Sequence, residues 1–359
     1  MTSIEKDVYL AFMGLAPKNV PHWEHWSDPD AETYLTGINY YEHPRLCRQR
    51  LNELYPELRL GIPESDAPVP PPKGDNVGNN TVRWGSDQTA TFLHGEQFFK
   101  DEEDVFKFSP LEHADMRGWK HVVDNLDFRS EADYERSLGH EPGTPWPQLE
   151  EFSFASTGTY NTMFMWPLLC FGWEMFMATC LDPRFERIMD EFAELNRRAF
   201  AVMAKRPEKF AVCHDDIMTT RGPVCSRKWM NKYIFPRYEE FWGMLKKAGK
   251  EIIFMVDGNI DAYADDIFAC GARGIISEPY TDYKAIARKH KDCFIAGEGD
   301  NRVLTRNNPE EIKAIVKSMA ETAKMSGGYM MCIGNHIPWN VPGEAIKLYL
   351  DYSREYAVR

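Results

Sequence analysis

Short apolar runs that end at polar residues recur through the second half of the chain. Between them lie segments in which apolar residues return with the period of a helix, such as Ala262–Cys270, Tyr283–His290 and Pro309–Ser326. Strand-like and helical patterns that alternate at spacings of about twenty to forty residues are typical of βα units with a parallel sheet. The strand-like runs are Phe210–Cys213, Ile252–Val256, Gly274–Ile276, Cys293–Ala296 and Tyr329–Ile333.

Each of these runs is followed by ionisable or amide side chains. Ligands of parallel α/β proteins bind at the carboxyl ends of the strands, so side chains placed there are candidates for one common pocket. An aspartate after the first of these runs has a competing role, because it can cap the segment that follows. The candidates are His214, Asp215, Asp257, Glu278, Glu298, Asn335 and His336.

The last of these runs has the most distinctive surroundings. Glycines stand on both sides of it, and Asn335 and His336 then precede Pro338 and Pro342. A strand that ends in this way is suited to present side chains at the mouth of a barrel. The competing interpretation is an ordinary strand-to-helix turn with a solvated histidine.

The first 60 residues have helical, acidic patterns that are interrupted by the segment Val20–Trp26, VPHWEHW. One interpretation is a first strand that delivers His22, Glu24 or His25 to the same mouth. The other is an amphipathic surface segment with exposed histidines, and this is the preferred interpretation.

Loops dominate the next part of the chain. Asp66–Asn80 is rich in proline and glycine, which predicts a loop that can serve as a lid. Thr81–Phe99 alternates as a β-hairpin does, and Ser109–Phe128 is expected to be helical in part.

An aromatic-rich helix start follows the strand-like run Phe152–Ser156. The loop between them contains Tyr160 and Asn161, and Trp166 lies at the start of the helix. These three side chains are candidates to hold a planar substrate, with ordinary core packing as the alternative. Further helices are predicted over Asp182–Ala204 and Arg227–Gly249.

The composition limits the class of protein. With 359 residues, of which 43% are hydrophobic, the chain can form one large α/β barrel or two average domains. A formal charge of −13 and the lack of a basic run argue against a nucleic-acid surface. No run approaches the roughly 18 apolar residues of a membrane span. Eight cysteines without a CxxC pair, and a charged N-terminus, predict a cytoplasmic protein with reduced thiols.

Five sequence blocks resemble the uroporphyrinogen decarboxylase superfamily. The resemblance covers about two-fifths of the chain and implies a single (β/α)8 TIM barrel over residues 1–359. Residues 1–150 would supply N-terminal helices, a hairpin and long loops over this barrel. The blocks are HDDIMTTRGPVCSRKWMNKYIFPRY from His214, MVDGN from Met255, EP at Glu278, AGEGDNRVL from Ala296 and GGYMMCIGNHIPWNVPGE from Gly327.

Two branches of this superfamily fit the sequence poorly. The decarboxylases carry an N-terminal, arginine-rich segment that binds the propionate groups of a tetrapyrrole, whereas this chain has HWEHW at residues 22–26. The methyltransferases that act on coenzyme M bind zinc through His-x-Cys and a later Cys. The corresponding positions here are Met255, Asp257 and Asn335, so the thiolate ligands are absent.

The pattern Asp-Gly-Asn, Glu-Pro and His before Ile-Pro looks like a third branch, the corrinoid-dependent methyltransferases of anaerobes. These include O-demethylase components that act on vanillate or veratrole. The resemblance implies transfer of a methyl group from a small methoxylated substrate to a separate cobalamin-binding protein. It also implies zinc held by carboxylate and histidine, for which Asp257, Glu278 and His336 are the candidate ligands, from three strand ends. Glu298 and Asn335 are expected to contact the substrate.

Two chemical roles stay open for the candidate catalytic residues. An aryl methyl ether is inert because phenolate leaves poorly, and a Lewis acid at the ether oxygen would stabilise the charge that develops there. In the metal-free alternative, a carboxylic acid with a raised pKa protonates the leaving oxygen. A decarboxylase and a non-catalytic ligand-binding barrel are the competing functions, and the choice between monomer and homodimer is open. The candidate catalytic residues are His214, Asp215, Asp257, Glu278 and His336.

Overall fold

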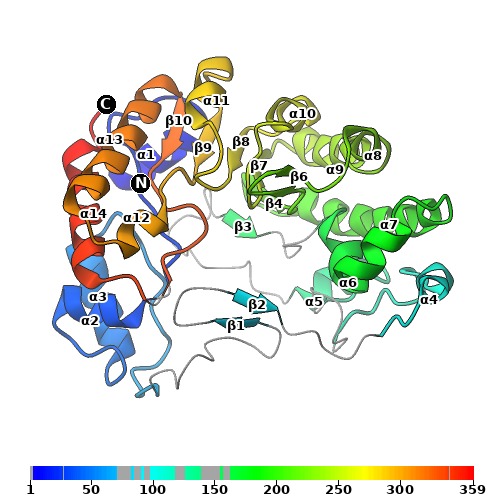
Figure 1. Cartoon of the computed structure of the whole chain (residues 1–359), viewed down its shortest axis with the longest axis horizontal. Coiled ribbons are helices and arrows are strands. Elements are labelled where there is room, and N and C mark those ends of the chain that lie inside the picture. The colour runs from blue at the N-terminus through cyan, green and yellow to red at the C-terminus, as the bar shows by residue number, and fades with distance from the viewer. Residues whose placement is uncertain are drawn as a thin grey trace. The chain divides into compact units, whose positions relative to one another are not determined.

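The computed structural model describes residues 3–26, 28–70, 82–84, 90–92, 98–117, 126–138, 154–156, 162–338 and 340–359. The chain divides into two compact units. The first unit comprises residues 1–96 and 277–359, and the second comprises residues 97–276. Parallel strands alternate with helices in both units (Figure 1), which confirms the predicted α/β class.

The second unit contains a parallel sheet in the order β3 (Phe154–Ser156), β4 (Phe210–His214), β7 (Glu251–Met255) and β8 (Gly274–Ile276). The register places His214 beside Met255, so β4 and β7 end side by side. All four strands of this sheet overlap apolar runs that the sequence predicts to be strands. The helices are α4 (Glu102–Lys107), α5 (Glu131–Ser137), α6 (Met165–Thr179), α7 (Phe185–Lys205), α8 (Arg227–Tyr233), α9 (Phe235–Lys247) and α10 (Ala264–Cys270), with a small hairpin of β5 (Met218–Thr219) and β6 (Gly222–Pro223).

The helix predicted over residues 227–249 is present in two pieces. The single helix predicted over 227–249 is divided between α8 and α9 at Ile234, which has a φ of −110° and a ψ of −63°. Pro236 accounts for the break, because it lacks the backbone N–H that would bond to the carbonyl of Lys232 four residues earlier, and it stands in the first turn of α9, where this loss is tolerated. Residues 118–125 lie outside the described residues, so the partly helical segment expected over 109–128 stays a prediction, and its described residues hold no helix. Asp115 and Asp127 instead form an antiparallel bridge.

The first unit contains the parallel pair β9 (Phe294–Ala296) and β10 (Gly328–Met330). The antiparallel hairpin of β1 (Val82–Trp84) and β2 (Ala90–Phe92) confirms the predicted hairpin. The helices are α1 (Ser3–Phe12), α2 (Pro29–Thr36), α3 (Pro44–Leu54), α11 (Tyr283–Lys289), α12 (Asn301–Thr305), α13 (Pro309–Met325) and α14 (Gly343–Tyr356). Among the described residues, none of the helices combines the length and the apolar character that crossing a bilayer demands.

The segment 20–26 runs parallel to the segment that follows β10. Bridges join His22 to Met331 and Trp26 to Ile337. His22 and Glu24 are buried, with 5% and 1% exposure, while Trp23 and His25 are exposed. This alternation is that of a strand with one buried face. The segment is therefore extended with one buried face, which favours the first-strand interpretation over the surface one, and delivery of its side chains to a barrel mouth stays a prediction.

Candidate functional site

The carboxyl ends of β4 and β7 bring together His214, Asp216 and Asp257. One ligand atom from each of these side chains lies within 4.8 Å of the other two. His214 is the last residue of β4, and its Nε2 lies 3.0 Å from Asp216 Oδ1. The same carboxylate oxygen accepts a hydrogen bond from the backbone N–H of Asp257 at 2.9 Å, which links the two strand ends. We call these three residues the His214 cluster.

A glycine fixes the position of Asp257 in this cluster. Gly258 has a φ of 90°, and a Cβ atom there would lie 2.6 Å from the carbonyl carbon and oxygen of Thr219. The backbone N–H of Asn259 donates to the same carbonyl at 3.0 Å. The turn after β7 is therefore packed against the β5–β6 hairpin, and only glycine allows this approach.

The electrostatics of the His214 cluster favour a charged pair. Burial by itself would lower the pKa of His214, but the hydrogen bond with Asp216 and the charges of the nearby carboxylates outweigh it and raise this pKa. Burial would raise the pKa of Asp216, yet the hydrogen bond and charge of His214 lower it below its ordinary value. Both effects stabilise an imidazolium–carboxylate pair.

The donor set of the His214 cluster fits a divalent metal ion. Imidazole nitrogen and carboxylate oxygen both bind zinc, and a catalytic zinc ion with three protein ligands keeps a further position open. Asp257 was a predicted ligand, whereas Asp216 was not chosen from the sequence. The signal was present, because Asp216 is the third member of the run of ionisable residues that begins at His214, the last residue of β4.

Asp215 has a different role from its neighbours on either side. Its side chain is fully buried and accepts hydrogen bonds from the backbone N–H groups of Thr162, Phe164 and Met165 at 3.2, 3.1 and 2.8 Å. The hydroxyl of Tyr238 donates to it at 2.7 Å, and the hydroxyl of Thr162 also donates to it. Burial raises the pKa of Asp215 against these hydrogen bonds. The geometry gives Asp215 the role of fastening the start of α6 to the end of β4, and its catalytic role stays a prediction.

The predicted aromatic clamp is described only in part. Tyr160 and Asn161 lie outside the described residues. Trp166 is 2% exposed, and its ring packs edge to face with those of Phe128 and Phe192 at centroid distances of 4.8 and 5.9 Å. Trp166 thus has the packing of a core residue, as the alternative interpretation of this segment expected.

Glu298, in the first unit, is held by side chains of two elements. Its carboxylate accepts hydrogen bonds from Tyr329 at 2.7 Å, Thr322 at 3.0 Å and Ser318 at 3.2 Å. Burial raises the pKa of Glu298 although these hydrogen bonds oppose the rise. The carboxylate therefore connects the end of β9 to α13 and β10, and its predicted contact with a substrate stays a prediction.

His336 lies beside a histidine from the opposite end of the chain. The ring centroids of His25 and His336 are 5.6 Å apart, with a tilt of 55°. His336 Nδ1 lies 2.8 Å from Asn335 Oδ1. Burial lowers the pKa of both histidines, and for His336 the proximity of His25 lowers it further.

The backbone of Glu278 packs against the turn that carries His336. A Cβ atom on Gly334 would lie 2.6 Å from the Gly297 carbonyl oxygen and 3.1 Å from the Cα atom of Glu278. Glu278 and the turn of His336 are thus close at the backbone. Because Asp257 belongs to the other unit, the predicted three-residue metal site and the common pocket of all candidates stay predictions.

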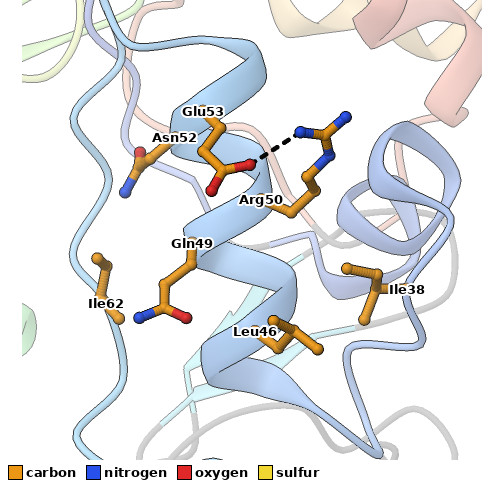
Figure 2. Close-up of a pocket in the computed structure, with 7 residues that line it drawn as sticks. All are labelled: Ile38, Leu46, Gln49, Arg50, Asn52, Glu53 and Ile62. Atoms are coloured by element: carbon orange, nitrogen blue, oxygen red, sulfur yellow. Dashed lines mark hydrogen bonds and ion pairs between the residues drawn. The ribbon is translucent and has the colours of Figure 1, made fainter.

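A cavity of about 500 Å³ lies on the exposed face of α3 (Figure 2). Arg50 and Glu53 form an ion pair of 2.8 Å at one side of it. None of the predicted site residues lines this cavity, so it lends no support to the predicted pocket. Its lining residues are Ile38, Leu46, Gln49, Arg50, Asn52, Glu53 and Ile62.

Comparisons with known proteins agree with the fold. The sequence of residues 184–356 matches the uroporphyrinogen decarboxylase (URO-D) family, and no curated protein matches the chain. A solved structure of a methyltransferase from Methanosarcina mazei shares the fold with a TM-score of 0.56 and 13% identity, over 99% of each chain. An uncharacterized protein matches 46% of this chain and 44% of its own, with a TM-score of 0.30 and 12% identity. The likeness to the methyltransferase over the whole chain confirms the predicted (β/α)8 fold class.

Proposed function

We propose that the chain is a corrinoid-dependent methyltransferase, in keeping with the match of residues 184–356 to the uroporphyrinogen decarboxylase family. It removes a methyl group from a small methoxylated compound and passes it to the cobalt of a corrinoid on a separate protein. The observation that carries the proposal is the His214 cluster, in which an imidazole and two carboxylates converge at the ends of neighbouring strands. The fold shared with a methyltransferase supports it.

The transfer has a simple balance of bonds and electrons. The methyl carbon leaves the ether oxygen without the electron pair of the broken bond and takes the pair supplied by cob(I)alamin. The oxygen keeps the pair of the broken bond and must be neutralised by a proton or another positive charge. Charge that develops on this oxygen is what the site has to stabilise.

The residues of the His214 cluster can meet this need. His214, Asp216 and Asp257 would hold a zinc-like ion, which supplies a Lewis acid for the ether oxygen when it is bound. Without an ion, His214 Nε2 would instead hold a proton against Asp216 Oδ1, and that proton could be delivered to the leaving oxygen. Asp215 keeps His214 and Asp216 in place through its hydrogen bonds to the start of α6.

The decarboxylase alternative has the family match in its favour and the charge of the site against it. A tetrapyrrole with several carboxylates needs cationic partners. The segment that takes the place of the arginine-rich element carries His22, Glu24 and His25, and the Glu24 carboxylate is buried. An anionic protein with this segment is better suited to a substrate of low charge.

Methyl transfer to cob(I)alamin under anaerobic conditions tests the proposal. We expect the purified protein to form methylcob(III)alamin from a methoxylated aromatic compound, which its absorbance spectrum would reveal. His214→Ala and Asp257→Asn should lower the rate by about 10- to 100-fold or more, the loss usual for damage to a metal site. The control is Asp190→Asn, which removes an exposed carboxylate paired with Arg237 on the outer helices of the same unit.

Metal analysis completes the test. The wild-type protein should carry a zinc-like ion at the His214 cluster, and the metal content of His214→Ala should be lower by about one ion per chain. Release of carbon dioxide from uroporphyrinogen, with no methyl transfer from any methoxylated compound, would overturn the proposal in favour of the decarboxylase.

A further inference from the structure

His25 and His336 lie on adjacent parallel segments of the first unit. The backbone N–H of Ile337 donates to the His25 carbonyl at 2.9 Å, and a parallel bridge joins Trp26 to Ile337. Residues directly before a bridged pair point to the opposite face from that pair. Because Trp26 and Ile337 are buried, the two imidazoles share the outer face, with centroids 5.6 Å apart.

The ring of His336 is oriented by its neighbour. Its Nδ1 lies 2.8 Å from Asn335 Oδ1, and an amide oxygen can only accept, so Nδ1 carries the proton and Nε2 carries the lone pair. Asn335 has a φ of 70°, a left-handed geometry that few side chains other than asparagine tolerate. Asn301 Nδ2 donates to the His336 carbonyl at 3.3 Å. An imidazole whose other nitrogen donates to an oxygen is the usual arrangement of a metal-binding histidine.

The spacing of the two rings fits one shared ion. Metal–nitrogen bonds to histidine are about 2.0–2.1 Å long, and a ring centroid lies about 1.1 Å beyond its nitrogen, so two imidazoles on one ion have centroids about 4.5–6.4 Å apart. The observed 5.6 Å falls in this range and corresponds to an angle of about 120° at the ion. Trp23 stacks on His25 at 6.3 Å and 23°, which limits the rotation of that ring.

We propose that His25 and His336 form a chelating pair for a divalent transition-metal ion. Imidazole is a ligand of intermediate softness, so the ions expected are Zn²⁺, Ni²⁺ and Cu²⁺ and not Mg²⁺ or Ca²⁺. Two protein ligands leave positions on the ion for water or for an oxygen atom of a bound molecule. The pair is separate in composition from the His214 cluster, and its binding of an ion does not depend on the proposed methyl transfer.

A calorimetric titration of the metal-free full chain with NiCl2 tests whether His25 and His336 bind an ion together. We expect His25→Asn and His336→Asn each to weaken nickel binding by at least about tenfold, and the double variant to be no weaker than either single variant, since one imidazole alone does not chelate. Asn335→Gly keeps the left-handed backbone and removes the hydrogen bond to His336, so it should weaken binding by a smaller factor. His43→Asn is the control, because His43 is an exposed histidine paired with Asp66.

The His214→Ala variant separates the two possible Ni²⁺ sites. It should lose binding at the His214 cluster and keep the binding that depends on His25 and His336. Circular dichroism should show that all variants are folded. The Cu²⁺-loaded protein should show two imidazole nitrogens in its electron paramagnetic resonance spectrum. The proposal is overturned if His25→Asn and His336→Asn both bind Ni²⁺ within about twofold of wild type, or if His214→Ala removes all binding.

Discussion

Tyr238 donates a hydrogen bond from its hydroxyl to Asp215 Oδ2 at 2.7 Å, and both side chains are completely buried or nearly so. Asp215 stands between His214 and Asp216 in the chain. The contact therefore ties α9, which carries Tyr238, to the strand end that presents the His214 cluster. A fully buried carboxylate depends on such donors, because burial alone disfavours its charge.

Tyr238→Phe should lower the free energy of unfolding by about 1.5–3 kcal/mol, the usual value of a hydrogen bond to a charged group. Tyr263→Phe is the matched control. Its hydroxyl donates to the neutral carbonyl of Cys225 at 2.9 Å, so its loss should cost only about 0.5–1.5 kcal/mol. Urea unfolding of both variants measures the difference. Equal losses would show that the Asp215 carboxylate does not rely on Tyr238.

Asp28 gives the first unit a predictable dependence on pH. Burial is the main cause that raises the pKa of this carboxyl from 3.8 to about 7. Between about pH 4 and pH 7 the folded protein therefore binds a proton that the unfolded chain has released. The contribution of Asp28 to the free energy of unfolding is largest below about pH 4. It falls by on the order of 4 kcal/mol as the pH rises towards 7.

Asp28→Asn should remove this part of the pH dependence. Asn keeps the side-chain oxygen that accepts from the backbone N–H of Ala31 at 2.8 Å, so the cap of α2 is preserved. The free energy of unfolding, measured from pH 4.5 to pH 8, should fall more steeply for wild type than for the variant. At pH 8 the variant should be the more stable protein. Parallel curves for the two proteins would contradict the raised pKa.

Gly297, directly before Glu298, should tolerate no side chain. Its φ is 99°, and a Cβ atom would lie 1.8 Å from the Ser277 carbonyl oxygen. Gly297→Ala should therefore cost well over the roughly 1–2 kcal/mol that a left-handed backbone alone costs an L-residue. Gly37→Ala is the control, since Gly37 has a φ of 71° and open space around it. Thermal unfolding of the two variants should differ strongly, and similar melting temperatures would argue against the close approach at Gly297.

The strand pattern was predictable because apolar runs report buried strands directly. Gly274–Ile276 coincides with β8, β4 extends one residue beyond its predicted run, and β7 is shifted by one residue at both ends. The apolar pattern predicts a single strand over residues 329–333. In the structure β10 ends at Met330, and the pairing continues through bridges of Met331 to His22 and of Ile333 to Gly299. Local sequence shows that such a run is extended, but it does not show which partner it pairs with.

The partners of the site residues were beyond local sequence for the same reason. Three consecutive ionisable residues, His214 to Asp216, stand at the end of β4, and local sequence does not show which of their side chains turns inward. The structure separates them through Thr162 and Tyr238, which come from elements distant in the chain and fasten Asp215. The proximity of His25 to His336 could not be predicted for a similar reason, because His336 comes from the far end of the chain.

The last prediction concerns how the His214 cluster treats the leaving oxygen. If His214 acts as a proton donor, His214→Ala should lose most activity on an ether with a poor leaving group and less on one whose phenol is more acidic, because an acidic phenol needs less help from an acid. If it holds a metal ion, the variant should lose its ion and its activity on both ethers together. Rates with a vanillate-like ether and with one that carries an electron-withdrawing ring, measured beside metal content, separate the two roles. Wild-type turnover of both ethers by His214→Ala would remove His214 from the reaction.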